Sequence, residues 1–332
     1  MRKAMGFFVA AALAVGLVTG CGTPSKTNMV SKLQSQAEKL DATNYRSTAT
    51  MTVQMDNGSQ TYYVETNYES PSVYKISLGD SSKNINQVIV RNTNGMFIVS
   101  PSLQKVFRFN GNWAQNQGHI YLYDQLLQQI AQAKDVKMAS KNGIYTFTMP
   151  MTTQNDVISK QEVEINGNTL APQKVVLYDQ TGHAVVTLNF TSFQTGVKFT
   201  NTEFDPHAIA GADKGAQTTL AMDQPFGYIT PNNTLGDSLA MLQPQSSDNT
   251  VMKYIGQYGF TLEEWRPVAG DAGFLDAQLV DLYGVPALYS GGGNSHQLTW
   301  LNNDIEFALT SSALSQSQMQ EVALSTFAQS GK

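Results

Sequence analysis

Short alternating segments separated by hairpin turns constrain the fold of this chain more than any other feature. Between residues 48 and 190, apolar and polar residues alternate in short runs, which is the period of strands with one buried face. The turns between the runs favour tight hairpins, because Asn and Gly tolerate positive φ. Successive hairpins predict one large antiparallel sheet that curls. The turns are Asp56-Asn57-Gly58, Asn94-Gly95, Asn142-Gly143, Asn166-Gly167 and Thr181-Gly182.

Two segments have helical spacing instead. Residues 28–40 carry one apolar stripe that includes Leu33 and Leu40, and residues 119–132 keep the same spacing. Two amphipathic helices are too few to cover the outside of a large sheet, but they suffice to plug a concave face. We therefore expect an α+β fold in which a curled antiparallel half-barrel sheet is closed by two helices.

The pattern changes once along the chain, whose 332 residues are enough for about two domains. Ala, Gly, Asp, Lys and Thr dominate residues 208–224, which predicts a linker between a domain over 28–207 and a smaller α+β domain over 225–332. Ser315 and Gln318 form a capping box before a final helix. The other elements expected in the second domain are strands over 254–265, 277–282 and 285–289, and a hairpin of 297–301 with 305–309.

The N-terminus has the parts of an export signal. A short basic start precedes an apolar run from Ala4 to Val18, which is shorter than the roughly 20 residues of a membrane span. Leu17-Val18-Thr19-Gly20-Cys21 resembles the bacterial lipobox, whose cysteine is lipidated and becomes the first residue of the mature chain. The resemblance implies a signal peptide over 1–20 and a tether over 21–27. It also implies a diacylglyceryl group on Cys21 that anchors the protein to the outer face of the cell membrane.

Composition excludes several classes of function. With 21 basic and 26 acidic residues, the net charge of −5 argues against a nucleic-acid partner bound through a basic face. A single cysteine rules out an intrachain disulfide and a cysteine-based zinc site. The four histidines, at 119, 183, 207 and 296, lie in no metal-binding motif, so we expect no metal and no cofactor. Charged residues make up only 14%, against about 25% on average, which we interpret as adaptation to an acidic habitat.

Two short motifs suggest chemistry that their surroundings do not support. Gly236-Asp237-Ser238-Leu239 spells the nucleophile motif of GDSL esterases, but no strand is expected before it, and His296 lacks the aspartate that precedes the histidine in that family. A serine without a base is inert, so we expect no enzyme and interpret Asp237 or Ser238 as a helix N-cap. Gly291-Gly292-Gly293 has no basic residue nearby, which favours a hairpin connection over a phosphate-binding loop.

The order of these elements resembles that of known exported proteins. Residues 25–207 resemble the LolA-like lipid-handling family, through Pro71-Ser72-Val73-Tyr74-Lys75-Ile76, Asn94-Gly95-Met96-Phe97, Lys105-Val106-Phe107-Arg108-Phe109 and Phe204-Asp205-Pro206. The C-terminal segment resembles a DUF4367-type domain, through Leu298-Thr299-Trp300, Ile305-Glu306-Phe307-Ala308-Leu309 and Leu314-Ser315. The combination is similar to Gram-positive sporulation- and germination-associated lipoproteins.

The resemblance implies a role in the envelope or the spore, and two hypotheses stay open. In the first, a non-enzymatic lipoprotein acts in cell-envelope or spore assembly or germination through contacts with an envelope protein or a lipid. In the second, the protein binds or presents an acyl lipid or a lipoprotein in an apolar concave cavity. The same side chains would otherwise form an ordinary core around the helices. The candidate lining is Met51, Val53, Met55, Tyr62, Val64, Tyr74, Ile76, Met96, Phe97, Leu126 and Ile130.

Overall fold

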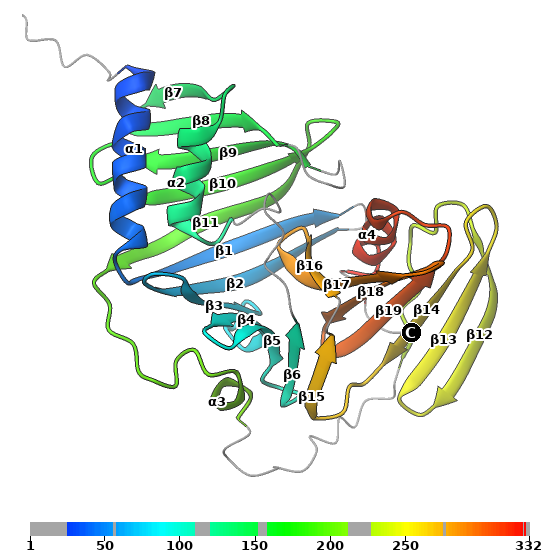
Figure 1. The fold of residues 1–332 in the computed structure, drawn as a ribbon. Coiled ribbons are helices and arrows are strands. Elements are labelled where there is room, and N and C mark those ends of the chain that lie inside the picture. Colours follow the sequence, from blue (N-terminus) through cyan, green and yellow to red (C-terminus); the bar gives the residue numbers. More distant parts are fainter. Residues whose placement is uncertain are drawn as a thin grey trace, which may run out of the picture.

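A computed structural model describes residues 25–55, 58–109, 120–151, 158–211, 227–274, 277–327 and 329. Two sheets dominate it, and few helices accompany them (Figure 1). We call residues 25–211 the N-terminal part and residues 227–329 the C-terminal part. The predicted signal peptide, Cys21, His119 and residues 212–224 of the predicted linker lie outside the described residues.

The N-terminal part begins with helix α1 (Lys26–Asp41). The side chain of Ser25 caps it by accepting a hydrogen bond from the Asn28 amide at 3.3 Å. Its buried stripe includes Leu33 and Leu40, as the sequence predicts. The remaining elements are β1 (Tyr45–Met55), β2 (Gly58–Glu69), β3 (Val73–Gly79), β4 (Ile85–Asn92), β5 (Gly95–Ser100), β6 (Lys105–Phe109), α2 (Tyr123–Gln132), β7 (Lys137–Lys141), β8 (Ile144–Pro150), β9 (Ile158–Asn166), β10 (Pro172–Asp179), β11 (Ala184–Thr195) and α3 (Pro206–Ala210).

These strands belong to a twelve-stranded sheet in the order β15-β6-β5-β4-β3-β2-β1-β11-β10-β9-β8-β7, in which β15 is Gly270–Phe274 of the C-terminal part. Sequential strands pair as antiparallel hairpins, and β1 joins the two halves by pairing with both β2 and β11. Helices α1 and α2 lie side by side over one face, which we call the inner face (Figure 1). The predicted α+β fold is confirmed: strands dominate, two helices lie on a large sheet that is antiparallel except for the pairing of β15 with β6, and a second sheet follows.

The N-terminal part differs from the sequence prediction in one helix boundary and one additional strand. The helix expected over 119–132 begins at Tyr123, and Ile120, Tyr121 and Leu122 are buried just before it without being helical. A run of apolar residues is expected in any buried segment, whether or not it is helical, so the sequence could not place the start of the helix. Strand β7 was not predicted, because its mostly exposed residues show no apolar alternation.

The C-terminal part forms a seven-stranded sheet in the order β12-β13-β14-β19-β18-β17-β16. Helix α4 (Gln316–Leu324) follows the last strand, and its predicted capping box of Ser315 and Gln318 is present. The strands are β12 (Ser238–Ser246), β13 (Asn249–Ile255), β14 (Phe260–Trp265), β16 (Ala277–Leu282), β17 (Val285–Gly292), β18 (Ser295–Asn302) and β19 (Ile305–Ser311).

Two predictions for this part were wrong. The single strand expected over 254–265 is instead the end of β13 and the whole of β14, and residues 256–259 form the turn that joins these two antiparallel strands. The helix expected after Asp237 or Ser238 is strand β12, since a register shift between Leu239 and Met241 lets apolar residues with near-helical spacing lie on a strand. The side chain of Asp237 accepts a hydrogen bond from the Gly259 amide at 2.6 Å instead of capping a helix.

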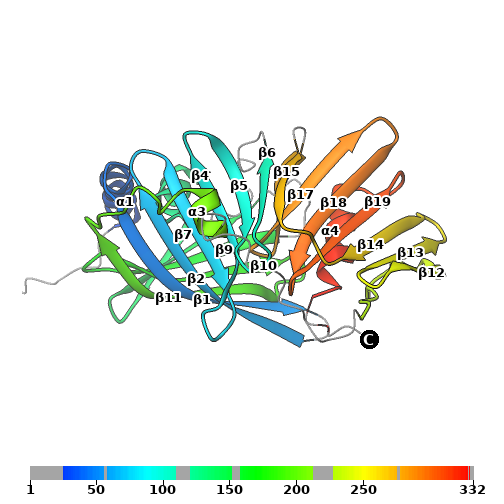
Figure 2. The ribbon, with the colours of Figure 1, turned by 90° about the horizontal axis from the view of Figure 1, so that it is seen from below.

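One strand crosses between the two parts. Strand β15 (Gly270–Phe274) leaves the C-terminal sheet and pairs in parallel with β6, with Gly270 opposite Lys105 (Figure 2). It therefore forms one edge of the large sheet, although about 160 residues separate it from its partner strand. The two parts are tied together by backbone pairing as well as by side chains.

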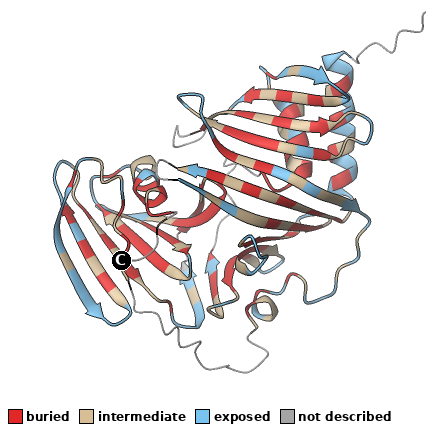
Figure 3. Cartoon of the chain, turned by 180° about the vertical axis from the view of Figure 1, so that it is seen from behind, coloured by how far each residue is buried: buried red, intermediate tan, exposed pale blue. Residues whose placement is uncertain are grey.

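Burial alternates along several strands of the large sheet, including β1, β8 and β9 (Figure 3). Strands β4 and β5 instead carry runs of consecutive buried residues, because both of their faces are covered. The largest apolar cluster joins the inner face of the large sheet to α1 and α2, and a second lies between the C-terminal sheet and α4. A smaller cluster, which includes Phe97, Val106 and Phe204, lies on the opposite face of β4–β6. Among the described residues, no helix has the length and apolar character needed to cross a membrane.

Candidate functional site

The residues predicted to line an apolar cavity are mostly packed in the largest cluster. Met51, Ile76, Leu126 and Ile130 are fully buried there, between the inner face and α2. Leu33 and Leu40 of α1 belong to the same cluster. Of the predicted lining, the residues brought together in this cluster are Met51, Val53, Val64, Tyr74, Ile76, Met96, Leu126 and Ile130.

Three predicted lining residues lie elsewhere. Phe97 belongs to the cluster on the opposite face, because Met96 and Phe97 are neighbours on β5 and neighbours on a strand point to opposite faces. The prediction that both point inward was therefore wrong for Phe97. Met55 and Tyr62 are partly buried and contact both of the two larger clusters. They mark the place where the N-terminal and C-terminal parts meet.

The hairpin of β16 and β17 closes the inner face from the C-terminal side. Ala277, Leu279 and Leu288 point into the largest cluster, beside the side chains of the N-terminal part. Val280 and Leu282, on the other face of the same strand β16, pack with α4 in the second cluster. This hairpin is thus buried on both faces, as a layer between the two cores.

The turn of this hairpin enters the N-terminal core. Tyr283 and Gly284 both have positive φ (52° and 94°), the geometry of a type I′ turn. The Tyr121 hydroxyl donates a hydrogen bond to the Gly284 carbonyl oxygen. A Cβ at Gly284 would lie 2.5 Å from Met51 Sδ and 2.7 Å from the Tyr121 hydroxyl, so only glycine fits.

Polar contacts lie along the same junction. Lys105 of β6 forms an ion pair with Glu306 of β19 at 2.9 Å, and their side chains are 13% and 3% exposed. The Ser102 hydroxyl donates to Asp304 Oδ1 at 2.7 Å. Because a nearly buried charge needs its partner, the Lys105–Glu306 pair makes separation of the two parts costly.

Buried carboxyl groups lie in and beside the junction. Burial raises the pKa of Asp281 to about 7, although the hydrogen bond from the Gly284 amide lowers it. Burial likewise raises the pKa of Glu264 to about 7. The Ile229 amide partly offsets this rise, because it donates hydrogen bonds to both carboxylate oxygens, at 3.1 and 3.0 Å. Burial also raises the pKa of Glu306, and Lys105 opposes that shift. For Asp281 and Glu264, whose pKa lies near 7, a large fraction of the folded protein therefore carries the protonated carboxyl group at neutral pH.

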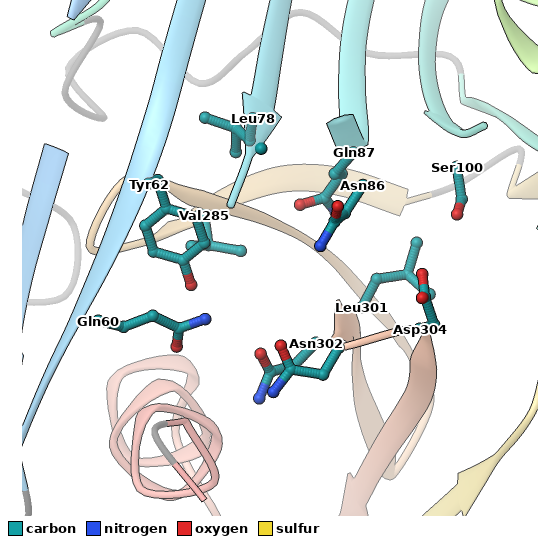
Figure 4. Close-up of a pocket in the computed structure, with 12 residues that line it drawn as sticks. Gln60, Tyr62, Leu78, Asn86, Gln87, Ser100, Val285, Leu301, Asn302 and Asp304 are labelled. Atoms are coloured by element: carbon teal, nitrogen blue, oxygen red, sulfur yellow. The ribbon is translucent and has the colours of Figure 1, made fainter. Parts of the chain in front are cut away.

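A polar cavity, which we call the junction pocket, lies between the two parts (Figure 4). It is partly open to solvent, and a volume of about 40 Å³ is available in it to the centres of water-sized groups. A single water molecule requires only about 10–15 Å³ of such space. The N-terminal part contributes Gln60, Tyr62, Leu78, Gly79, Asn86, Gln87 and Ser100, and the C-terminal part contributes Val285, Leu301, Asn302, Asn303 and Asp304.

Two larger hollows also involve both parts. One, of about 750 Å³, lies over the cluster that contains Phe97 and includes Arg108, His207 and Asp271. His207 Nδ1 lies 3.8 Å from Asp271 Oδ1 of β15 there. The other, of about 470 Å³, lies between the β10–β11 turn and α4 and includes His183. Both are open and mixed in polarity.

The motifs that suggested chemistry do not assemble a reactive group. Ser238 begins the exposed edge strand β12, and His296 accepts from or donates to the Tyr289 hydroxyl at 3.0 Å on another strand. Within the described ranges, no three His, Cys, Asp or Glu side chains gather closely enough to hold a metal ion. Gly291 and Gly292 end β17 in the predicted hairpin connection.

The junction itself was missed at the level of sequence. Leu282-Tyr283-Gly284-Val285 gives a hairpin signal, because a glycine lies between two apolar runs, but nothing in it shows which core the turn enters. The Lys105–Glu306 pair spans 201 positions and has no local signature.

Comparisons with known proteins agree with the predicted resemblance. The family of sporulation protein YdcC-like proteins matches residues 1–204, which is more than half of the chain. The sporulation protein YdcC of Bacillus subtilis is 28% identical over 341 residues, covering 100% of this chain and 99% of that protein.

Solved structures with similar elements are more distant. The MucA/MucB complex of Pseudomonas aeruginosa contributes a chain that is 14% identical, with a TM-score of 0.34 and coverage of 90% of this chain and 98% of that one. A LolA superfamily protein from Nitrosomonas europaea is 11% identical, with a TM-score of 0.30 and coverage of 52% and 96%. The predicted relation to sporulation proteins is confirmed by the family match: the chain belongs to the YdcC-like family of sporulation proteins.

Proposed function

We propose that this chain is a membrane-anchored extracytoplasmic lipoprotein that acts in spore or envelope assembly or germination by binding another protein. The family supports the context of sporulation, and the lipobox ending at Cys21 supports the anchor. In this proposal the C-terminal part is a DUF4367-type domain that is docked on a LolA-like domain. The proposed activity is binding and involves no catalytic step.

The closed inner face is the observation that carries the proposal. A site for acyl chains needs an apolar cavity of some hundreds of Å³. Here Leu126 and Ile130 fill the inner face from the helix side, and Leu279 and Leu288 fill it from the hairpin side. These side chains pack as a core, which favours a protein that presents its outer surfaces to a partner.

Replacement of the lipidated cysteine tests the anchor. We expect Cys21→Ala to move the protein from the membrane to the soluble fraction of a Gram-positive host, because one missing thioether removes both acyl chains. Ser25→Ala, four residues further along, is the matched control and should stay at the membrane. If the Cys21→Ala protein stayed there too, the anchor would be wrong, while the binding role would stand.

Native mass spectrometry and cross-linking separate the binding role from lipid binding. The full chain, purified in detergent and released from it in the spectrometer, should carry no lipid beyond its own anchor. Photo-cross-linking in sporulating Bacillus subtilis should give protein adducts that are absent from growing cells. A non-covalent acyl lipid at a ratio near one to one would instead support the alternative, a lipid-presenting protein.

A further inference from the structure

One edge of the C-terminal sheet is open. Strand β12 lies at the end of the strand order, and β13 is its only partner strand among the described residues (Figure 1). Eight of its nine residues are exposed, as Figure 3 shows. One row of its backbone N–H and C=O groups therefore faces solvent and can pair with a further strand. A register shift leaves Ala240 without a partner residue even on β13, which adds to the free groups.

The other edge strands carry features that hinder such pairing. Strand β7 has exposed lysines at both ends, Lys137 and Lys141, and β15 is short and carries the exposed Asp271. Strand β16 is buried between the two larger clusters. Strand β12 is longer than β7 and β15 and has no charged residue in its sequence, Ser238-Leu239-Ala240-Met241-Leu242-Gln243-Pro244-Gln245-Ser246.

Exposed apolar side chains gather at this edge. Among the described residues four large apolar side chains are exposed, and three of them, Leu239, Met241 and Ile255, lie on β12 or on the adjoining end of β13. Leu239 lies opposite Tyr254, whose side chain is buried in the core, whereas Met241 lies opposite the neighbouring Lys253. Because neighbours on a strand point to opposite faces, apolar atoms are exposed on both faces of one edge.

Exposure on both faces selects a strand as the occupant. The side chains of an extended strand alternate between the two faces of a sheet and cover both, whereas a helix or a flat surface covers one. Pro244 has no N–H to donate, so pairing is confined to residues 238–242. Five residues give about 17 Å of strand, and in a sheet about 10 Å thick they give a contact of about 170 Å² on each side.

This area argues against a second copy of the chain. Stable interfaces between folded proteins bury about 800 Å² on each partner, and two copies with a net charge of −5 also repel each other. Lys253 is the only charged residue of β13, the strand beside the edge, which favours a neutral or acidic partner segment over a basic one. We propose that β12 accepts an extended, apolar and uncharged or acidic segment of the partner protein as an eighth strand of the C-terminal sheet. This rests on the binding role under the proposed function and names what the partner contributes.

Fluorescence anisotropy on the full chain in detergent tests the proposal with two labelled, end-capped peptides in which valine and threonine alternate. The first is N-methylated on the valines only, so one edge of the peptide keeps its free N–H groups, since alternate residues point them to opposite edges. The second is N-methylated on every residue and keeps none. Strand pairing predicts that the second peptide binds at least about tenfold more weakly, because it forms two or more fewer hydrogen bonds. Empty detergent micelles give the background.

Variants locate the site on the chain. Met241→Lys puts a charge on the edge and removes apolar contact, so affinity for the first peptide should fall about fourfold or more. Its Tm should be kept, because Met241 is exposed. Leu239→Lys should act in the same way from the other face, even if Met241→Lys fails to fold. Val268→Lys is the matched control, because Val268 is also an exposed apolar residue but lies outside the strands, and this variant should bind normally.

Three results would overturn the proposal. The first peptide could fail to bind above the micelle background, which would mean that the edge accepts no strand. Both peptides could bind alike, which would remove backbone pairing from the argument. Both edge variants could fold and bind as well as Val268→Lys, which would place the peptide elsewhere on the chain. If any of these results came with sporulation-specific cross-links, the binding role would stand and the partner would bind at another surface. Absence of the cross-links would instead refute the proposed function, whatever the peptides do.

Discussion

Replacement of Gly284 by alanine tests whether the turn of the β16–β17 hairpin holds the two parts together. The new Cβ adds two costs. At a φ of 94° an L-residue is disfavoured by about 1–2 kcal/mol. The Cβ would also lie 2.5 Å from Met51 Sδ and 2.7 Å from the Tyr121 hydroxyl, in a core where extra methyl groups typically cost about 1–3 kcal/mol. We expect a total loss of about 2–5 kcal/mol, a large share of the stability of a typical domain, about 5–15 kcal/mol.

Urea denaturation, followed by tryptophan fluorescence, to which the buried Trp300 of the C-terminal core contributes, measures this loss. Gly293→Ala is the matched control. Gly293 also has positive φ (65°) in a hairpin turn, but a Cβ there meets nothing within 4 Å. It should lose only the backbone contribution. If Gly284→Ala lost no more stability than Gly293→Ala, the turn would not be packed against Met51 and Tyr121 in solution, and the closed inner face would be refuted.

Three further predictions concern buried charges and a helix end. Lys105→Met leaves the carboxylate of Glu306 buried without its partner and should lower the free energy of unfolding in urea by about 3–5 kcal/mol. The double variant Lys105→Met, Glu306→Leu should recover most of that stability. If the double variant instead lost as much as the two single variants together, the two side chains would not be coupled. The folded-state pKa of Glu264, about 7, lies 2.5 units above the ordinary 4.5 (7 − 4.5), so the folded state binds the proton more tightly and its stability falls by up to about 3 kcal/mol as pH rises from 4.5 through 7. Thermal denaturation should therefore give a higher Tm at pH 5 than at pH 8, and Glu264→Gln, but not Glu263→Gln on the other face of β14, should reduce that difference. Ser315→Ala removes the cap of α4 and should lower stability by about 1 kcal/mol, whereas an unchanged Tm would mean that the capping box contributes nothing.

The local pattern predicted most strands because each carries its own signal. The alternation around Met51 and Ile76 and the Asn94-Gly95 turn are local, and the strands there agree with the prediction to within a few residues. Strand β15 could not be found in this way. Gly270-Asp271-Ala272-Gly273-Phe274 has no alternation, and its pairing with β6 depends on the approach of two distant segments.

The candidate site was less predictable than the fold. Period-two alternation alone excludes that Met96 and Phe97 share a face, so the misplacement of Phe97 was avoidable. The junction pocket was not predictable, because Gln60 and Asn302 are ordinary polar residues in sequence and line one cavity only through docking of the two parts. The raised pKa of Glu264 also has no signature in the sequence, because it depends on burial by residues that are distant along the chain.

The crossing strand β15 has a consequence for the order in which the chain folds. A chain is synthesised from its N-terminus, so β6 is available long before residues 270–274 arrive. Until then one edge of the large sheet is unpaired, and the inner face lacks Leu279 and Leu288 as its cover. The nascent protein therefore exposes an unpaired strand edge and an apolar face, both of which favour aggregation, until the last fifth of the chain has been synthesised.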